Sequence, residues 1–186
     1  VGYLTQIEAA NGAFGFDEEE VDSFEFGYKY QSNDRRLSVN SAIFHTEIGD
    51  MQREVNLPSE SAGVSQSILN TADATIQGLE IEAAWFVTED FRLTGNIGLI
   101  DGEYDKLSFD ISGDGVVDAA DLALDIPRLP ETTYGIGFNW YKPLQKGGNL
   151  AVSANWQYRD SVAYTDSNVG WLNEQDIIDI DIAWIP

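Results

Sequence analysis

Residues 75–100 read TIQGLEIEAAWFVTEDFRLTGNIGLI, and this stretch decides the fold. From Leu79 to Trp85 every second residue is apolar, and after a break at residues 88–90 a second alternating run begins at Phe91. Side chains of a β-strand point to opposite faces with a period of two. The stretch therefore predicts a hairpin of two long strands with one apolar and one hydrophilic face.

The same alternation recurs along most of the chain. Together with the opening hairpin, these segments predict about seven long strands. Phe44 breaks the parity of its segment, and we treat it as an exception. The further segments with alternating apolar residues are 21–30, 37–47, 133–140, 150–159 and 178–184.

The predicted connections alternate in length. Short turns are expected at 32–35, 88–90 and 143–148, and long loops at 49–73, 101–129 and 160–175. Transmembrane β-barrels of outer membranes have short periplasmic turns and long extracellular loops. Aromatic residues gather on the apolar face near the short turns, as in the girdle of such a barrel, and Trp156 and Tyr158 fit a girdle at the other end. Those near the short turns are Tyr28, Tyr30, Trp85, Phe91, Trp140 and Trp184.

Composition limits the other possibilities. The chain has 186 residues, which is enough for one domain. No run approaches the roughly 18 apolar residues of a spanning helix, so a membrane role requires strands. The net charge of −22 argues against nucleic acid as a partner. The absence of cysteine excludes a disulfide scaffold and a thiolate metal site.

The sequence predicts no enzyme. Its one histidine, His45, has the parity of the apolar face, and no nucleophile elbow, zinc motif or phosphate-binding glycine loop is found. Glu80 and Glu82 share the hydrophilic face, where we expect them to pair with Lys or Arg on neighbouring strands. Candidate partners are Lys29, Arg92 and Arg159.

The favoured fold class is all-β, an antiparallel up-and-down transmembrane β-barrel segment of about seven long strands from a larger barrel. The alternative is a soluble β-sandwich with a buried apolar face, whose strands are typically about five or six residues long. The two differ in what covers the apolar face. A dry centre formed by Phe26, Leu79, Phe138 and Ile180 would refute the membrane interpretation.

Several segments together resemble the barrel domain of TonB-dependent outer-membrane receptors, and the resemblance covers most of residues 17–186. It implies a plugged barrel of about 22 strands. It also implies localisation in the outer membrane of a Gram-negative bacterium, contact with outer-membrane lipid, and import of a scarce bulky nutrient, with an iron–siderophore complex favoured. The segments are VDSFEFGYK (21–29), RLSVNSAIFHTEIGDMQ (36–52), NTADATIQGLEIEAAW (70–85), PETTYGIGFNW (130–140) and WQYRD (156–160).

The sequence also departs from that family. It contains no plug and no segment that contacts TonB, although the resemblance implies the TonB complex as the energy source through a plug. With about seven strands, residues 1–186 are expected to be part of the receptor barrel. Such a sheet has two unpaired edges, so we expect the isolated chain neither to insert nor to transport.

Residues 110–122, within the long loop 101–129, resemble the calcium loop of EF-hands, in its dockerin variety. Oxygen ligands at the first, third, fifth, seventh, ninth and twelfth positions converge on one Ca²⁺ ion, and a glycine at the sixth allows the turn. Val117 and Leu122 are expected to anchor the loop in an apolar cluster, and residues 119–124 to form a helical turn. The alternative is an acidic turn that is merely solvated. The expected ligands of a structural Ca²⁺ are Asp110, Ser112, Asp114, Val116, Asp118 and Asp121.

Two functions therefore remain open from the sequence. The favoured one is part of a TonB-dependent transport receptor with ligand contacts in the three long loops. The alternative is a secreted calcium-dependent binding module with a β-sandwich fold. Fractionation of the parent protein with the outer membrane distinguishes them.

Overall fold

The computed structural model describes residues 16–59, 63–145 and 147–186. It contains a seven-stranded antiparallel sheet in the order β1-β2-β3-β4-β5-β6-β9 and a small β7–β8 hairpin. The strands are β1 (Glu20–Gln31), β2 (Leu37–Ser59), β3 (Gly63–Phe86), β4 (Phe91–Leu107), β5 (Thr132–Pro143), β6 (Asn149–Arg159), β7 (Val162–Ala163), β8 (Trp171–Leu172) and β9 (Gln175–Ile185), and the one helix of the described ranges is α2 (Ala119–Leu122).

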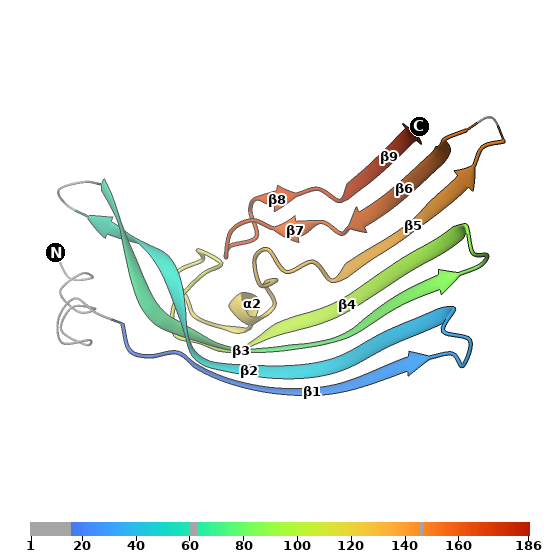
Figure 1. The fold of residues 1–186 in the computed structure, drawn as a ribbon. Coiled ribbons are helices and arrows are strands. Elements are labelled where there is room, and N and C mark those ends of the chain that lie inside the picture. The colour runs from blue at the N-terminus through green and yellow to red at the C-terminus, as the bar shows by residue number, and fades with distance from the viewer. Residues whose placement is uncertain (1–15, 60–62, 146) are drawn as a thin grey trace.

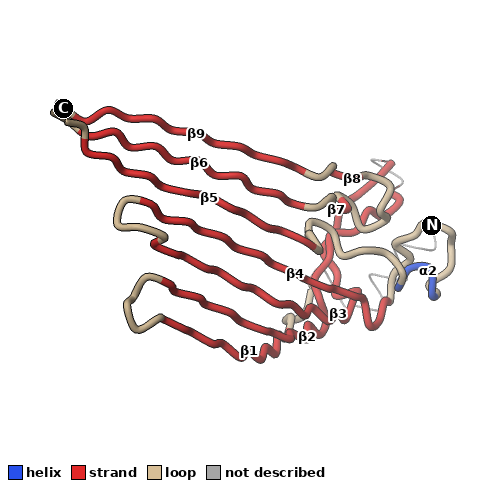
Figure 2. Tube along the Cα trace, turned by 90° about the vertical axis from the view of Figure 1, so that its right-hand side faces the viewer, coloured by secondary structure: helices blue, strands red, loops and turns tan. Residues whose placement is uncertain are grey.

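The seven long strands and their up-and-down order confirm the predicted fold class. Figure 2 shows a single layer of strands with short turns at one end, the turn end, and long connections with α2 at the other, the loop end. In the part of the chain that the structure describes, no helix is both long enough and apolar enough to cross a bilayer.

The pairing register places the alternating residues in continuous rows across the sheet. Phe26, Ile43, Leu79 and Leu99, for example, form one row on the apolar face. This face stays exposed: Phe26 is 69% and Ile180 68% accessible. Within the described residues no second sheet covers it, so the β-sandwich alternative is wrong.

The apolar band is staggered from strand to strand. Tyr30, at the turn end of the band on β1, shares a row with Ile178, at the loop end of the band on β9. The β9 band continues towards the turns as far as Trp184. At about 3.3 Å per residue and about 4.8 Å between strands, this shift over the sheet gives a tilt of about 35°. Strands of transmembrane barrels tilt by about 35–45°.

The boundaries of the long loops were predicted wrongly. Residues 49–59 and 63–73 belong to the paired strands of a hairpin, because β2 continues to Ser59 and β3 begins at Gly63, with register irregularities around Met51. Likewise, β4 continues to Leu107, and residues 160–175 contain the β7–β8 hairpin. The sequence of these extensions lacks the regular alternation of apolar and polar residues on which the prediction depended.

Phe44 is an exception to the alternation of apolar and polar residues, as the sequence indicated. Its register with Gly78 places it on the hydrophilic face. A Cβ atom at Gly78 would lie 2.6 Å from Phe44 Cζ and 2.7 Å from the Leu99 carbonyl oxygen, so only glycine leaves room for this ring. Residues 1–8, whose sequence VGYLTQIE is compatible with the end of a strand, lie outside the described residues.

Candidate functional site

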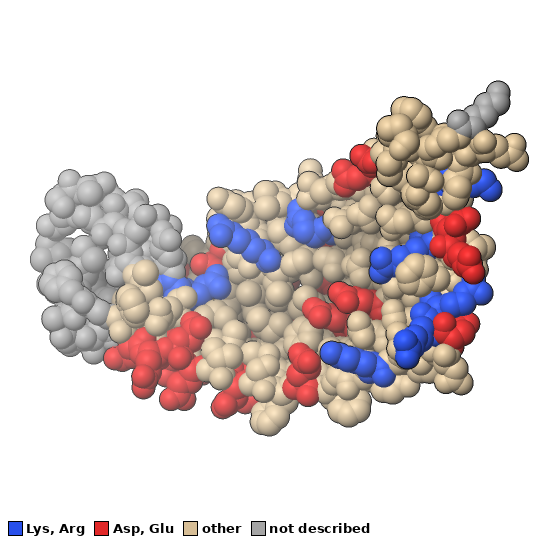
Figure 3. Space-filling view, in the orientation of Figure 1, with Lys and Arg blue, Asp and Glu red and all other residues tan. Residues whose placement is uncertain are grey.

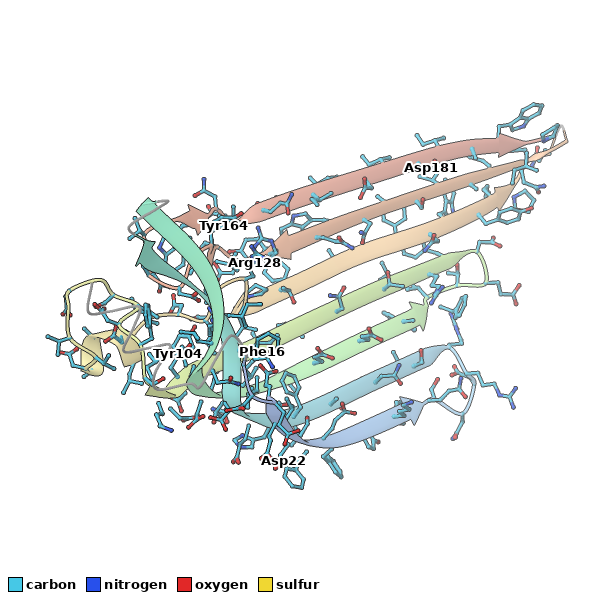
Figure 4. All side chains as sticks on the ribbon, turned by 90° about the vertical axis from the view of Figure 1, so that its left-hand side faces the viewer. Phe16, Asp22, Tyr104, Arg128, Tyr164 and Asp181 are labelled. Atoms are coloured by element: carbon cyan, nitrogen blue, oxygen red, sulfur yellow. The ribbon has the colours of Figure 1, made fainter. Side chains whose placement is uncertain are left out.

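Three long connections meet at the loop end. They are the outer part of the β2–β3 hairpin (49–73), the β4–β5 connection (108–131) and the β6–β9 connection (160–174). In Figure 1, β2 and β3 curve upwards at this end, and α2 and the β7–β8 hairpin lie on the concave side of the sheet. Figure 4 places Tyr104, Arg128 and Tyr164 at the loop end, far from Asp181, which lies on β9 towards the turn end.

A small apolar cluster fixes the β4–β5 connection to the hydrophilic face. The parity of β3 and β4 turns Ala74 and Tyr104 towards this face, and Ile126 of the connection is buried against them. Leu129 occupies the space that a side chain at position 102 would need, since a Cβ atom at Gly102 would lie 2.4 Å from Leu129 Cδ2. The buried members are Met51, Ala72, Ala74, Tyr104 and Ile126.

Hydrogen bonds join the β4–β5 and β6–β9 connections. The Arg128 N–H donates to the Ala163 carbonyl at 2.9 Å. The Asn168 side chain accepts from the Asp125 N–H at 2.7 Å and donates to its carbonyl at 3.0 Å. The Arg128 guanidinium lies over the Tyr164 ring, 5.2 Å from its centroid. The two connections therefore form one continuous surface.

A third set of contacts adds the β2–β3 hairpin to this surface. Arg53 of β2 forms an ion pair with Asp166 of the β6–β9 connection. Its guanidinium also lies 5.8 Å from the ring centroid of Tyr104 in β4. Burial raises the pKa of Tyr104, and the charge of Arg53 opposes this shift. All three long connections thus contact one another over the hydrophilic face.

A cavity of about 230 Å³ lies between the two joined connections and β4. Its apolar wall includes Ile126, Leu129, Val162 and Trp171, and its polar wall includes carboxylates from both connections. It combines apolar and charged surface in an enclosure large enough for one small group, as ligand sites commonly do.

The proposed calcium loop has a defined local structure. Asp110 accepts hydrogen bonds from the N–H groups of Gly113 (2.6 Å) and Gly115 (2.7 Å), which hold the pKa of its carboxyl below the usual 3.8. Asp121 is fully buried. Burial raises its pKa, but the N–H donors of Asp118, Ser112 and Ile111 outweigh this effect and lower it.

Only some of the six expected ligands are brought together. Ser112 lies between Asp110 and Asp121, with its hydroxyl 3.1 Å from Asp110 Oδ1 and its N–H 2.8 Å from Asp121 Oδ1. Asp114 instead accepts from the N–H of Val116, a residue that is itself exposed. Asp118 accepts from the Ala120 N–H as the N-cap of α2. Across the described ranges, no group of three or more His, Cys, Asp or Glu side chains is arranged to hold a metal ion.

The surroundings of this loop differ partly from the prediction. The expected helical turn is present as α2. Val117 and Leu122, however, are 46% and 38% exposed and do not anchor it. Ile111 packs against the apolar cluster instead. Anchoring therefore comes from Ile111 near the start of the loop and from Ile126 beyond its end.

The hydrophilic face between the loop end and the turns is a polar wall. Lys29, Asn40, Glu82 and Asn96 share one row across β1 to β4. The ion pairs expected between neighbouring strands are not seen for Glu80 or Glu82 among the described residues. The two expected arginine partners are engaged elsewhere. Arg92 lies over the Phe86 ring, and Arg159 donates to the Asn173 carbonyl at 3.3 Å.

His45 lies on the apolar face, as its parity predicts, with Nε2 3.3 Å from Glu47 Oε1. No pattern in the sequence indicated the residues that connect the loops, which are Arg53, Tyr104, Arg128 and Asp166. One signal was available: Arg128 is the one basic residue of segment 108–131, and segment 160–174 has none. A single basic residue in an otherwise acidic loop is a candidate for a contact with a neighbouring acidic loop.

Acidic side chains also gather over the start of β1 at the loop end, as Figure 3 shows.

The sheet has an exposed, tilted apolar band on one face and a polar wall on the other, and this combination defines the class of protein. This sheet is part of the wall of a strand-built membrane protein, with its apolar face towards lipid. The family model described as "TonB dependent receptor-like, beta-barrel" matches residues 2–184, so the chain belongs to this family. It is therefore located in the outer membrane of Gram-negative bacteria. The family comprises transporters rather than enzymes, which confirms the prediction that the protein is not an enzyme.

Solved structures show the same fold. The ferric yersiniabactin uptake receptor FyuA from Yersinia pestis matches with a TM-score of 0.70 and 18% identity, over 89% of this chain and 22% of that one. The siderophore receptor PiuA from Acinetobacter baumannii matches with a TM-score of 0.66 and 20% identity, over 87% and 22%. The copper transporter OprC matches with a TM-score of 0.64 and 14% identity, over 89% and 23%. The chain thus spans about a fifth of their lengths.

Proposed function

We propose that the full receptor containing this segment imports a scarce metal complex, with an iron–siderophore complex as the favoured cargo. The main observation that supports this proposal is the arrangement of the loop end, where three connections meet over the polar face of a membrane wall. Similar structures include a ferric yersiniabactin uptake receptor and a siderophore receptor, which support this cargo, and a copper transporter, which keeps copper as the second candidate. The energy would come from the TonB complex, acting through a plug domain.

In this proposal each part of the segment has a role. The apolar band contacts outer-membrane lipid. The polar wall, with Glu80, Glu82 and Lys29 free of ion pairs among the described residues, provides charged groups to a plug domain or to water. The joined β4–β5 and β6–β9 connections provide an extracellular surface for first contact with the cargo.

Uptake measurements test this function. Deleting the full receptor gene should abolish uptake of radioactive iron from one ferric siderophore, and deleting tonB should have the same effect. A matched experiment with radioactive copper distinguishes the two cargo classes. Unchanged iron and copper uptake in the receptor deletion would refute both.

We further propose that residues 110–122 bind a structural Ca²⁺ ion. The specific support is the grouping of Asp110, Ser112 and the buried Asp121, whose oxygens are hard ligands of the kind Ca²⁺ prefers. Asp114, Asp118 and the Val116 carbonyl would complete the set after turning away from their present contacts. The ion would neutralise carboxylates that repel one another.

Calorimetry on the full receptor tests this proposal. Extracellular calcium modules bind with Kd of roughly 10⁻⁴–10⁻³ M. Asp114→Ala should abolish one calcium-binding event, whereas Asp125→Ala, three residues after the helix, should preserve it. Equal calcium binding by the wild type and Asp114→Ala would exclude this loop as the site.

A further inference from the structure

The ion pair between Arg53 and Asp166 joins segments that are distant in sequence. Arg53 lies on the outer part of β2, and Asp166 lies between β7 and β8. Both side chains are largely withdrawn from water, at 18% and 26% exposure. Arg53 also contacts Met51 Sδ at 3.7 Å and lies over the Tyr104 ring. One guanidinium group therefore links β2, β4 and the β6–β9 connection.

The charge of the β6–β9 connection makes this contact important. Residues 160–174 contain Asp160, Asp166 and Glu174 but no Lys or Arg. The connection packs beside residues 108–131, which contain six acidic residues and one arginine. Like charges oppose this packing. The other described contacts to this segment are hydrogen bonds, including one from the Arg159 guanidinium to the Asn173 carbonyl, the stacking of Arg128 on Tyr164, and the burial of Val162 and Ala163. Among the described ion pairs, only that of Arg53 neutralises a carboxylate of this segment.

Tyr104 supports Arg53 through its ring rather than its hydroxyl. Tyr104 is 4% exposed, and its hydroxyl group is buried without a hydrogen-bond partner among the described residues. An aromatic face stabilises a guanidinium group most when water is excluded. The aromatic surface, and not the phenol group, is thus the feature that positions Arg53 towards Asp166.

We propose that Arg53, Tyr104 and Asp166 form a latch that holds the β6–β9 connection across the hydrophilic face. Breaking the ion pair leaves a partly buried charge without its partner, which favours release of the connection into water. The consequence for transport rests on the proposed function: an anionic group on the cargo competes with Asp166 for Arg53 and opens the latch.

Hydrogen exchange of the full receptor in lipid nanodiscs tests the latch. Arg53→Met and Asp166→Asn should each accelerate amide exchange in residues 160–174 by about tenfold or more. The matched control is Lys106→Met, which removes a more exposed ion pair with Asp73 near the same end. That control should change exchange in residues 160–174 by less than about twofold.

Further variants separate a latch from a general loss of stability. Tyr104→Phe should preserve slow exchange, whereas Tyr104→Leu should accelerate it. Exchanging the charges, with Arg53→Asp and Asp166→Arg together, should restore part of the protection lost in either single variant. Heat-modifiable migration in gels verifies that each barrel is folded.

Two results would overturn the proposal. One is unchanged exchange in residues 160–174 of a folded Arg53→Met receptor. The other is an increase spread evenly over β4, β5 and β6. Because these measurements need no cargo and no transport, they stand apart from the uptake experiments that test the proposed function.

Discussion

Replacing Ile180 with arginine should destabilise the membrane-inserted receptor strongly. Ile180 lies near the middle of the β9 band, which runs from Ile178 to Trp184. It pairs with Ala154 and is 68% exposed in the segment, so few packing contacts are lost. The effect of the substitution therefore reports the medium that surrounds the side chain.

Lipid and water around residue 180 predict different losses of stability for the arginine substitution. An arginine on the lipid face near the bilayer midplane costs about 2–4 kcal/mol. A substitution at an exposed position in water usually changes stability by less than about 0.5 kcal/mol. The matched control is Asp179→Arg, one residue away on the polar face, where neighbouring Asn155 indicates a hydrated environment. We expect it to cost less than about 1 kcal/mol.

The assay is reversible urea unfolding of the full receptor in lipid vesicles, with the free energy of unfolding compared between the two variants. A difference of about 1.4 kcal/mol corresponds to a factor of ten in the equilibrium constant. Equal and small effects of Ile180→Arg and Asp179→Arg would show that the apolar face does not meet hydrocarbon.

The remaining predictions concern local features. Gly78→Ala should cost about 1–3 kcal/mol because its Cβ would clash with the Leu99 carbonyl, whereas Gly27→Ala, with its nearest atom at 3.8 Å, should cost less than about 0.5 kcal/mol in the same unfolding assay. The lowered pKa of Asp121 contributes loop stability that is fully present above the ordinary value of 3.8 and is lost as the pH falls below it. Pepsin cleavage in residues 108–131 should therefore accelerate as the pH falls below that value. Asp121→Asn should weaken this pH dependence and leave the part that the lowered pKa of Asp110 contributes. Asp118→Ala, which removes the N-cap of α2, should cost about 1 kcal/mol locally, measured by hydrogen exchange in residues 119–124.

The membrane wall could be predicted because one physical rule governs it. In lipid, every outward side chain must be apolar and every backbone group paired, so a period of two appears in the sequence. The alternation at Leu79–Trp85 and Ile178–Trp184 therefore predicted the strands and their two faces. The tilt could not be obtained, because it depends on the register between strands. Only the pairing of Tyr30 with Val39, and so on to Ile178, revealed it.

Beyond the bilayer this rule no longer applies. Residues 49–59 and 101–107 are paired strand, but no lipid there requires an apolar side chain at every second position, and the sequence predicted loops there. Contacts such as Arg53 with Asp166 join residues that no local pattern connects. The structure of the acidic loop could be predicted only in part. Its spacing predicted the helix that follows Asp118, but spacing alone does not show whether Asp114 and Asp118 turn towards a common centre.

The orientation of the two faces can be measured directly on β9. The chain contains no cysteine, so single cysteines at positions 178–182 each introduce one spin-label site in this segment. In the full receptor in lipid, labels at 178, 180 and 182 should collide mainly with oxygen dissolved in the bilayer, and labels at 179 and 181 with a water-soluble nickel complex. A label at 180 shielded from both reagents, or the same accessibility at all five positions, would contradict the membrane wall.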